Sequence, residues 1–172
     1  MKTPADDRIS REVTMHIRTG LEPGDIGYII YLHGVLYAQE YDLDRTFEGD
    51  VAIRMGEFAK TYDARKDYFA VAELEGKIVG SIIINGLSDE IAQVRWFLVH
   101  AEARGRGLGR QLIDGALAFC RERGYKKITL WTISELKAAA HLYRQAGFTV
   151  TREETHEIWG ATRTEQEYEL DL

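Results

Sequence analysis

Three arginines and three glycines alternate over residues 104–110, where the sequence reads RGRGLGR. Glycine lets a backbone turn tightly and approach an anion without a clash at Cβ. When such a loop opens a helix, the first N–H groups of the helix have no partner, and with the positive end of the helix dipole they attract phosphate. Arginine side chains add the counter-charge. The segment therefore predicts a phosphate-binding loop at the start of a helix.

The spacing of these glycines excludes two common phosphate-binding loops. A dinucleotide-binding G-x-G-x-x-G loop that begins at Gly105 would need a glycine where Arg110 stands. A nucleotide-triphosphate loop would end in Gly-Lys-Ser or Gly-Lys-Thr, whereas here Gly109 and Arg110 are followed by Gln111. The pattern that remains is R-x-x-G-x-G, over residues 104–109.

This pattern resembles the coenzyme A pyrophosphate loop of the GNAT family of N-acetyltransferases. A second motif of that family, L-Y-x-x-x-G-F, matches residues 142–148, which read LYRQAGF. Between the two motifs, helical spacing of apolar residues predicts a helix that ends at Arg123 and Gly124, and residues 128–132 predict a buried strand. Because both motifs stand in the family's order, the chain is identified as similar to this family.

The resemblance implies acetyl-CoA as the cosubstrate and no metal. In the family, the strand before the loop splays from its neighbour, and its free backbone groups pair with the pantetheine arm and the thioester. By position this role falls to the backbone of Phe97, Leu98 and Val99. The alternative for the loop arginines is a solvated surface. The residues expected to hold the pyrophosphate are Arg104, Gly105, Arg106, Gly107, Leu108, Gly109 and Arg110.

Tyr143 is the residue to which the resemblance assigns the role of acid for the departing thiolate. A phenol with a pKa near ~10 is protonated at neutral pH and can donate a proton. Simple packing of the ring is the alternative. Many family members carry an asparagine seven residues before this tyrosine that hydrogen-bonds the pantetheine, and here Leu136 stands there. Ser134 either replaces it as a cofactor contact or caps the helix.

No general base is evident, because the segment at residues 91–99 carries no carboxylate. His100 is one candidate, with a structural role as its alternative. The five histidines have no paired spacing that would indicate a metal site. In the family the first helix borders the acceptor pocket, so polar residues on one face of it are expected either to bind substrate or to form a structural patch. These residues are His33, Tyr37, Glu40 and Tyr41.

The elements that position these residues follow from the hydrophobic pattern. Alternation predicts a first strand at residues 13–18, and helical spacing predicts one helix that begins near Pro23 and another at residues 45–62. A hairpin turn at Glu75 and Gly76 is expected to join two strands. The residues expected to face the core from the two helices are Ile29, Leu32, Leu36, Phe47, Val51, Ile53, Met55 and Phe58.

The order of the elements is that of the GNAT family. This resemblance implies a single α/β (α+β) domain with a mixed, mostly antiparallel sheet of about seven strands flanked by about four helices. A short helix is expected at residues 135–145. After the first strand, further strands are expected at residues 68–72, 77–84, 91–99, 128–132, 148–152 and 166–170.

Length and composition agree with one domain at residues 12–172 after a loose segment at residues 1–11. The net charge of −6 argues against non-specific binding to nucleic acid, which needs a broad basic surface. The only cysteine, Cys120, lies on the apolar stripe of a predicted helix and is expected to be a buried, inert thiol. Without a signal peptide or a membrane-length apolar stretch, we expect a cytoplasmic protein with no membrane contact.

The similarity is closest to the acetyltransferase portion of bacterial chains that also carry a winged-helix MarR-type regulator. In that subgroup the first helix reads much like residues 33–41 (HGVLYAQEY), and the chain ends much like residues 167–172 (EYELDL). A winged helix does not fit into 172 residues beside the acetyltransferase portion. If this kinship holds, the chain is expected to be the catalytic module standing alone.

The resulting prediction is a cytoplasmic bacterial N-acetyltransferase that uses acetyl-CoA and transfers the acetyl group directly to a primary amine within a ternary complex. The alternative is a coenzyme A-binding sensor with the same fold and little turnover. A transferase for a longer acyl group is a third hypothesis. The acceptor is expected to be a small-molecule or peptide amine, which the sequence does not identify, and a homodimer is compatible with the sequence.

Overall fold

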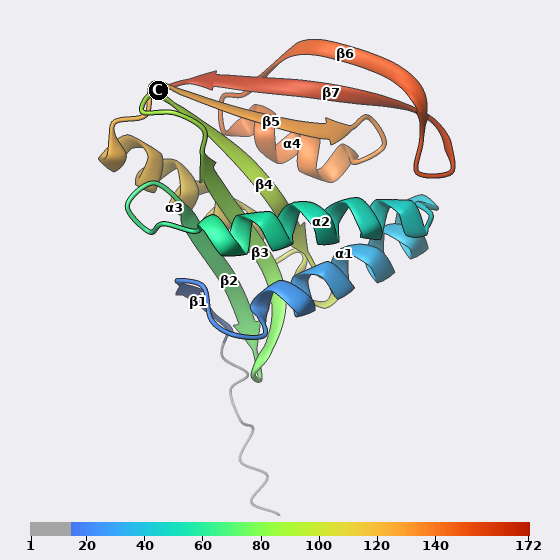
Figure 1. The fold of residues 1–172 in the computed structure, drawn as a ribbon, viewed down its shortest axis with the longest axis horizontal. Helices are drawn as coiled ribbons and strands as arrows, with labels where there is room; N and C mark the ends of the chain where they lie inside the picture. Colours follow the sequence, from blue (N-terminus) through green and yellow to red (C-terminus); the bar gives the residue numbers. More distant parts are fainter. Residues whose placement is uncertain (1–14) are drawn as a thin grey trace, which may run out of the picture.

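The computed structural model describes residues 15–172, so the loose segment expected at residues 1–11 and the first two residues of the expected first strand lie outside it. Seven strands and four α-helices form one domain, as predicted (Figure 1). The elements are β1 (Met15–Thr19), α1 (Asp25–Tyr41), α2 (Arg45–Thr61), β2 (Tyr68–Leu74), β3 (Lys77–Gly86), β4 (Ile91–Val99), a 3₁₀ turn (Ala101–Ala103), α3 (Leu108–Arg123), β5 (Lys127–Ile133), α4 (Lys137–Gln145), β6 (Thr149–Ile158) and β7 (Ala161–Asp171).

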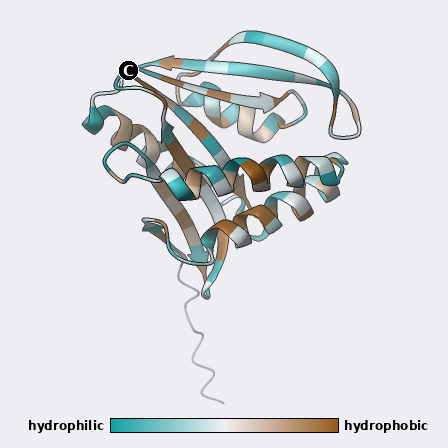
Figure 2. Ribbon diagram, viewed as in Figure 1, coloured by the Kyte–Doolittle hydropathy of each residue, from teal (hydrophilic) through white to brown (hydrophobic). Residues whose placement is uncertain are grey.

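The sheet has the order β1-β2-β3-β4-β5-β7-β6. All neighbours are antiparallel except β4 and β5, which are parallel. Helices α1 and α2 cover one face of the sheet, and α3 and α4 cover the other. Apolar residues gather on the central strands and on the inner sides of the helices, whereas β6 and β7 are mostly hydrophilic (Figure 2). Each face therefore has its own core.

Most of the predicted core is buried. In α2 the side chains of Phe47, Val51, Met55 and Phe58 are at most 9% exposed and share one face of the helix. The prediction for Ile53 is wrong, since this side chain is 65% exposed. It lies two residues from both Val51 and Met55, and such positions point to different sides of a helix.

The final hairpin is longer than predicted. Strands β6 and β7 run over Thr149–Ile158 and Ala161–Asp171, and Trp159 and Gly160 between them both have positive φ, as a tight hairpin turn requires. The prediction stopped short because charged and threonine side chains alternate on both sides of β6, which is largely exposed. Such a pattern lacks the apolar face by which a strand is recognised.

Strands β4 and β5 separate soon after they begin. Their pairing covers only residues 91–93 with residues 127–129, after which β5 pairs with β7 alone (Figure 1). On its other edge β4 is bulged against β3, with Trp96 at φ 46° and its carbonyl oxygen accepting a 2.7 Å hydrogen bond from Ser81 Oγ. The splay and the bulge together open the middle of the sheet.

No helix among residues 15–172 is long and apolar enough to cross a membrane.

Candidate functional site

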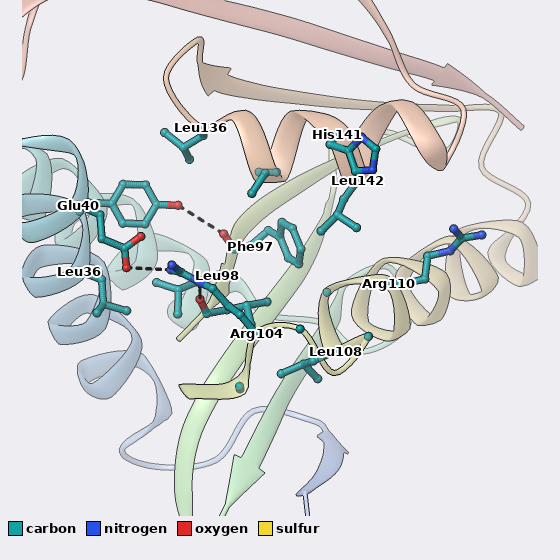
Figure 3. Close-up of a pocket in the computed structure, with 18 of the residues that line it drawn as sticks. Leu36, Glu40, Phe97, Leu98, Arg104, Leu108, Arg110, Leu136, His141 and Leu142 are labelled. Atoms are coloured by element: carbon teal, nitrogen blue, oxygen red, sulfur yellow. Dashed lines mark hydrogen bonds and ion pairs between the residues drawn. The ribbon is translucent and has the colours of Figure 1, made fainter. Parts of the chain in front are cut away.

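A first cavity of about 370 Å³ lies where the splayed end of β4 meets the glycine-rich loop and α4. Its wall is largely apolar, and it extends to α1 on the other side (Figure 3). The residues that line it are Leu36, Tyr37, Glu40, Tyr41, Phe97, Leu98, Val99, Ala103, Arg104, Gly105, Gly107, Leu108, Gly109, Arg110, Leu136, Ala138, Ala139, His141 and Leu142.

The loop presents a series of unpaired backbone N–H groups to this cavity. Gly105 and Gly107 have φ of 73° and 76°, and Gly107 precedes α3 without a side-chain cap. The first backbone hydrogen bond of the helix runs from the N–H of Gln111 to the carbonyl of Gly107, and within the described chain none joins the N–H groups of residues 105–110 to a backbone oxygen. A helix start with this many free donors fits an anion such as a pyrophosphate.

Gly109 has a role that the sequence did not indicate. A Cβ at this position would lie 2.8 Å from Cδ1 of Leu142 and 3.5 Å from Cζ of Phe97. A contact under about 3 Å between carbon atoms is repulsive. The third glycine of the motif therefore lets the start of α3 pack against α4 and β4, and its neighbours Gly105 and Gly107 provide the backbone turn.

The loop arginines differ in what they contact. Arg104 donates from Nη2 to Glu40 Oε1 at 2.8 Å and from Nε to the carbonyl oxygen of Val99 at 2.9 Å, and so it ties α1 to the end of β4 (Figure 3). Arg110 pairs with Asp114 one turn along α3 at 3.1 Å. Arg106 is exposed and lines neither cavity described here. Only Arg104 and Arg110 thus lie at the wall of the first cavity.

A second cavity of about 410 Å³ lies on the other side of the splay. It is enclosed by α1, α2, the middle of β4 and β5, and the β6–β7 hairpin. Tyr37, Phe97 and Leu136 line both cavities, so the two adjoin at these residues. The side chains that line the second cavity are otherwise His33, Phe47, Asp50, Val51, Arg54, Gln93, Val94, Arg95, Trp96, Leu130, Trp131, Thr132, Tyr143, Glu154, Ile158, Trp159 and Glu165.

Tyr143 lines the second cavity and contacts Phe97, one of the three residues that line both cavities. Its ring centroid is 5.8 Å from that of Phe97 and 5.7 Å from that of Tyr168. The side chain is only 6% exposed, and burial, with the nearby Tyr37 and Tyr168, raises the pKa of its phenol far above the usual value. The hydroxyl is therefore protonated at any physiological pH.

The four polar residues predicted to share a face of α1 divide between the cavities. His33 lines the second cavity, Glu40 and Tyr41 line the first, and Tyr37 lines both. The Tyr37 hydroxyl lies 3.5 Å from the carbonyl oxygen of Phe97, and burial, followed by Tyr41 and Glu40, raises its pKa. The face is thus both a set of internal contacts and a wall of the site, so the two alternatives for it are not exclusive.

His33 is a buried, neutral imidazole. Its Nδ1 lies 2.9 Å from the carbonyl oxygen of Ile29, to which it donates, and its ring stacks on Tyr37 at a centroid distance of 5.4 Å. Burial is the main cause that lowers the pKa of His33 to about 4, against a smaller upward effect of the bond to Ile29. At neutral pH the Nε2 atom therefore has a free lone pair and no proton.

Two other candidates lie away from both cavities. Ser134 Oγ hydrogen-bonds Glu135 Oε2 at 3.2 Å, and α4 begins at Lys137 after Leu136 without any side-chain cap. The prediction that Ser134 caps the helix is wrong, and the structure does not bring it to the cofactor side of the site. His100 accepts from the N–H of Glu102 at 3.4 Å and begins the 3₁₀ turn, which is a structural role.

Two residues that support the site were missed at the level of sequence. Arg163 on β7 is 5% exposed, and its Nη2 donates to the carbonyl oxygens of Tyr41 and Asp42 at the end of α1. Trp159 at the hairpin turn donates from Nε1 to Asp50 Oδ2 at 2.8 Å. An arginine in a polar strand and a tryptophan in a turn carry no local signal of burial, because the partners are more than a hundred residues away.

The model of the acetyltransferase (GNAT) family matches residues 36–148 of the chain. An uncharacterised N-acetyltransferase of Methanocaldococcus jannaschii is 35% identical over 89 residues, which cover 48% of this chain and 39% of that protein. Human N-acetyltransferase 8B is 31% identical over 118 residues, which cover 64% of this chain and 52% of that protein. The chain thus spans about half the length of these curated relatives, or less.

Solved structures share the fold over nearly the whole chain. An acetyltransferase from Streptococcus agalactiae has a TM-score of 0.71 at 23% identity, covering 92% of this chain and 98% of its own. A Salmonella typhimurium protein solved with its cofactor acetyl-CoA has a TM-score of 0.70 at 23% identity, covering 92% and 94%. Spermidine N-acetyltransferase from Vibrio cholerae, solved with coenzyme A and spermine, has a TM-score of 0.69 at 21% identity, covering 91% and 95%.

Proposed function

Because the chain belongs to the acetyltransferase (GNAT) family, we propose that it is an acetyl-CoA-dependent N-acetyltransferase that transfers the acetyl group directly to a primary amine in a ternary complex. The observation that carries this proposal is the pair of cavities. One ends at a loop of free N–H donors, the other is lined by polar and aromatic side chains, and both share Tyr37, Phe97 and Leu136. Two substrates could therefore bind at once and meet at the splay.

On the donor side, the residues fit acetyl-CoA. The N–H groups of residues 105–110 would hold the pyrophosphate, and Arg104 and Arg110 add positive charge at the wall. The apolar wall between α4 and β4 suits the pantetheine arm, and Leu136 offers it an apolar contact in place of a hydrogen bond. The thioester supplies an activated acetyl group. The backbone of Phe97, Leu98 and Val99, on the edge of β4 that β5 leaves free, would orient it.

At the junction, Tyr143 is proposed as the acid for the leaving thiolate. Its phenol keeps its proton because burial raises its pKa, and its ring is held between Phe97 and Tyr168. Tyr37 approaches the same point from α1, since it lines both cavities and reaches the carbonyl of Phe97. A hydroxyl held in place in this way can donate as negative charge develops on sulfur.

On the acceptor side, His33 is proposed as a hydrogen-bond acceptor for the amine. Its Nδ1 is occupied by the Ile29 carbonyl, so only Nε2 is available to a bound group. Because burial lowers its pKa to about 4, the ring holds a proton poorly and is unsuited to be the general base. His33 would instead orient the lone pair of an amine that has already lost its proton to water.

The resemblance to the MarR-linked subgroup, the place of action and the acceptor class also belong to this proposal. Residues 33–41, which resemble the MarR-linked subgroup, form the part of α1 that borders both cavities. Residues 167–172 belong to the end of β7 and the residue after it. A cytoplasmic place of action would give the protein access to acetyl-CoA. Small-molecule and peptide amines both remain in the proposed acceptor class.

The test is a free-thiol release assay with acetyl-CoA against a panel of amines, run beside calorimetric titration of acetyl-CoA. We expect micromolar binding of acetyl-CoA, a higher Tm in its presence, and turnover with at least one amine. Tight binding without turnover on any amine would favour the sensor, which the apolar Leu136 in the cofactor wall would also suit. Tighter binding of NAD than of acetyl-CoA would contradict the proposal.

A further inference from the structure

The second cavity has two arginines at its wall, one exposed and one half-buried. Arg54 on α2 and Arg95 on β4 both line it. Neither forms an ion pair with a carboxylate within 4.0 Å in the part of the chain that the structure describes. A cation pair at a cavity wall without a counter-ion is a place where an anionic group would be stabilised.

The carboxylates of the same cavity are already engaged. Asp50 accepts from the indole N–H of Trp159 at 2.8 Å. Glu165 lies 2.8 Å from Nε2 of His156, and Glu154 pairs with Arg152. Of these partners only Arg152 is charged at any pH, since the indole of Trp159 is neutral and His156 is charged only when protonated. The cavity wall therefore carries both signs of charge, and its two arginines are the cations that no ion pair engages among the described residues.

Arg95 directly precedes Trp96 at the β4 bulge. Its guanidinium carbon lies 4.7 Å from the ring centroid of Trp96, the residue with positive φ. Burial and then the positive charge of Arg54 lower the pKa of Arg95, and Glu57 opposes this. Glu57 does not line the cavity. Both guanidinium groups belong to residues that line the same cavity, so an anion bound there would interact with both.

We propose that Arg54 and Arg95 bind the carboxylate of the acceptor, which makes the acceptor an amino acid and distinguishes it from a simple amine or a polyamine. This inference rests on the proposed function and names its substrate class. Arg95 is two residues from Phe97, so their Cα atoms lie no more than about 7 Å apart whatever the path of the bulge. A carboxylate at the arginines would therefore place an amino group a few atoms away near Phe97 and Tyr143, the junction with the donor cavity.

The chain carries its own probe for this test. It has three tryptophans, Trp96, Trp131 and Trp159, and all three line the second cavity. Intrinsic fluorescence should therefore respond to acceptor binding without turnover. We would titrate the full chain, with and without non-reactive coenzyme A, using α-amino acids, their decarboxylated amines, their methyl esters and spermidine. At least one amino acid should bind ten times or more tighter than its amine and its ester.

Variants assign the preference to the two arginines. Arg95→Gln and Arg54→Gln should each weaken binding of the amino acid about tenfold and leave the matched amine within a few-fold, and Arg95→Lys should restore part of the loss. Lys60→Gln removes a positive charge from α2, the helix of Arg54, at an exposed position that does not line the cavity. This variant should change neither the affinity for the amino acid nor that for the matched amine. Circular dichroism and Tm would check that every variant is folded.

Equal affinity for acids, amines and esters would overturn the inference, as would tighter binding of spermidine that increases in Arg95→Gln. No fluorescence response to any amino acid, with or without coenzyme A, would also overturn it. These outcomes are separate from failure of the proposed function, which would be seen as an absence of acetyl-CoA binding or of thiol release with every amine. Turnover on amines without a carboxylate preference would contradict the inference alone.

Discussion

At the scale of single residues, the site depends on buried groups whose protonation the surroundings determine. Tyr143 stays protonated because burial raises its pKa, and His33 stays neutral because burial lowers its pKa to about 4. Both side chains are less than 7% exposed. The same physical effect, the cost of a charge in a poorly solvated place, thus keeps one residue a donor and the other an acceptor.

The role of Tyr143 is tested by Tyr143→Phe. The change removes one oxygen and leaves the ring packed against Phe97 and Tyr168. If the hydroxyl donates to the thiolate, kcat should fall about 100-fold, the low end for general-acid catalysis, while acetyl-CoA affinity changes by no more than a few-fold. Thiol release measures kcat, and calorimetry measures the affinity for acetyl-CoA. Equal turnover in both proteins would remove Tyr143 from the mechanism.

The buried His33 predicts a loss of stability in acid. Its pKa is about 4 in the folded protein against 6.5 in the unfolded chain, so the unfolded state binds more protons between these values. Above pH 6.5 the neutral His33 does not lower the free energy of unfolding, because it is unprotonated in both states. As the pH falls from 6.5 toward about 4, the free energy of unfolding decreases, by roughly 3 kcal/mol at most.

Urea unfolding at pH 7 and pH 4 would measure this loss. His33→Phe keeps a ring to stack on Tyr37 and has no titrating group. Its free energy of unfolding should therefore fall less than that of the wild type over the same interval. Parallel losses in the two proteins would show that His33 is accessible to protons in the folded state.

At the scale of elements, the start of α3 is the feature that most directly supports the proposed binding of coenzyme A. Gly107 holds the left-handed conformation that turns the loop into the helix, and the N–H groups around it are free. The splay of β4 from β5 supplies the second half of the site, because it leaves the end of β4 without β5 as a strand partner beside the loop. The start of α3 and the free edge of β4 thus meet at the first cavity.

Gly107→Ala should separate the binding role of this turn from its contribution to stability. At φ 76° an added Cβ meets no atom within 4 Å, so the strain lies in the backbone, at about 1–2 kcal/mol. Relaxation of that strain would turn the N–H groups away from the anion. Coenzyme A affinity should fall tenfold or more, about 1.4 kcal/mol.

Gly76→Ala is the matched control, with φ 77° and open space in the β2–β3 turn, away from both cavities. The two variants should lose similar amounts of Tm, but only Gly107→Ala should lose coenzyme A affinity by calorimetry. Equal affinity in both folded variants would place the pyrophosphate elsewhere.

At the scale of the whole molecule, Arg163 joins three parts of the fold. From β7 it donates to the end of α1 through Tyr41 and Asp42, and its Nη1 pairs with Glu135 before α4 at 2.9 Å. Each of these parts borders a cavity. The site is therefore assembled by a contact between segments from the two ends of the described chain.

Arg163→Gln should destabilise the protein by about 1–3 kcal/mol, because it leaves the carbonyl oxygens of Tyr41 and Asp42 and the carboxylate of Glu135 without their arginine donor. It should also raise KM for the acceptor, since the hairpin wall is no longer held. Arg65→Gln removes an exposed partner of Asp63 and is expected to change Tm little. Thermal unfolding and steady-state kinetics would measure both. Similar small effects from the two changes would show that Arg163 holds nothing in place.

The sequence by itself determined the local features: the loop at residues 104–110, the motif at residues 142–148, and most helix and strand positions. These depend on turn chemistry, helix ends and periodic apolar residues, which act over a few neighbours along the chain. The family and the fold class followed from them and are confirmed.

Only the tertiary structure decided the walls of the second cavity. β7 lies between β5 and β6, and this order brings Arg163 and Trp159 to α1 and α2, more than a hundred residues away. The fold similarly brings Arg95 of β4 and Arg54 of α2 to the wall of one cavity. Such pairs leave no local pattern, because a polar or aromatic residue has the same neighbours in sequence whether it meets solvent or a distant helix. The glycine-rich loop was therefore predictable and the second cavity was not.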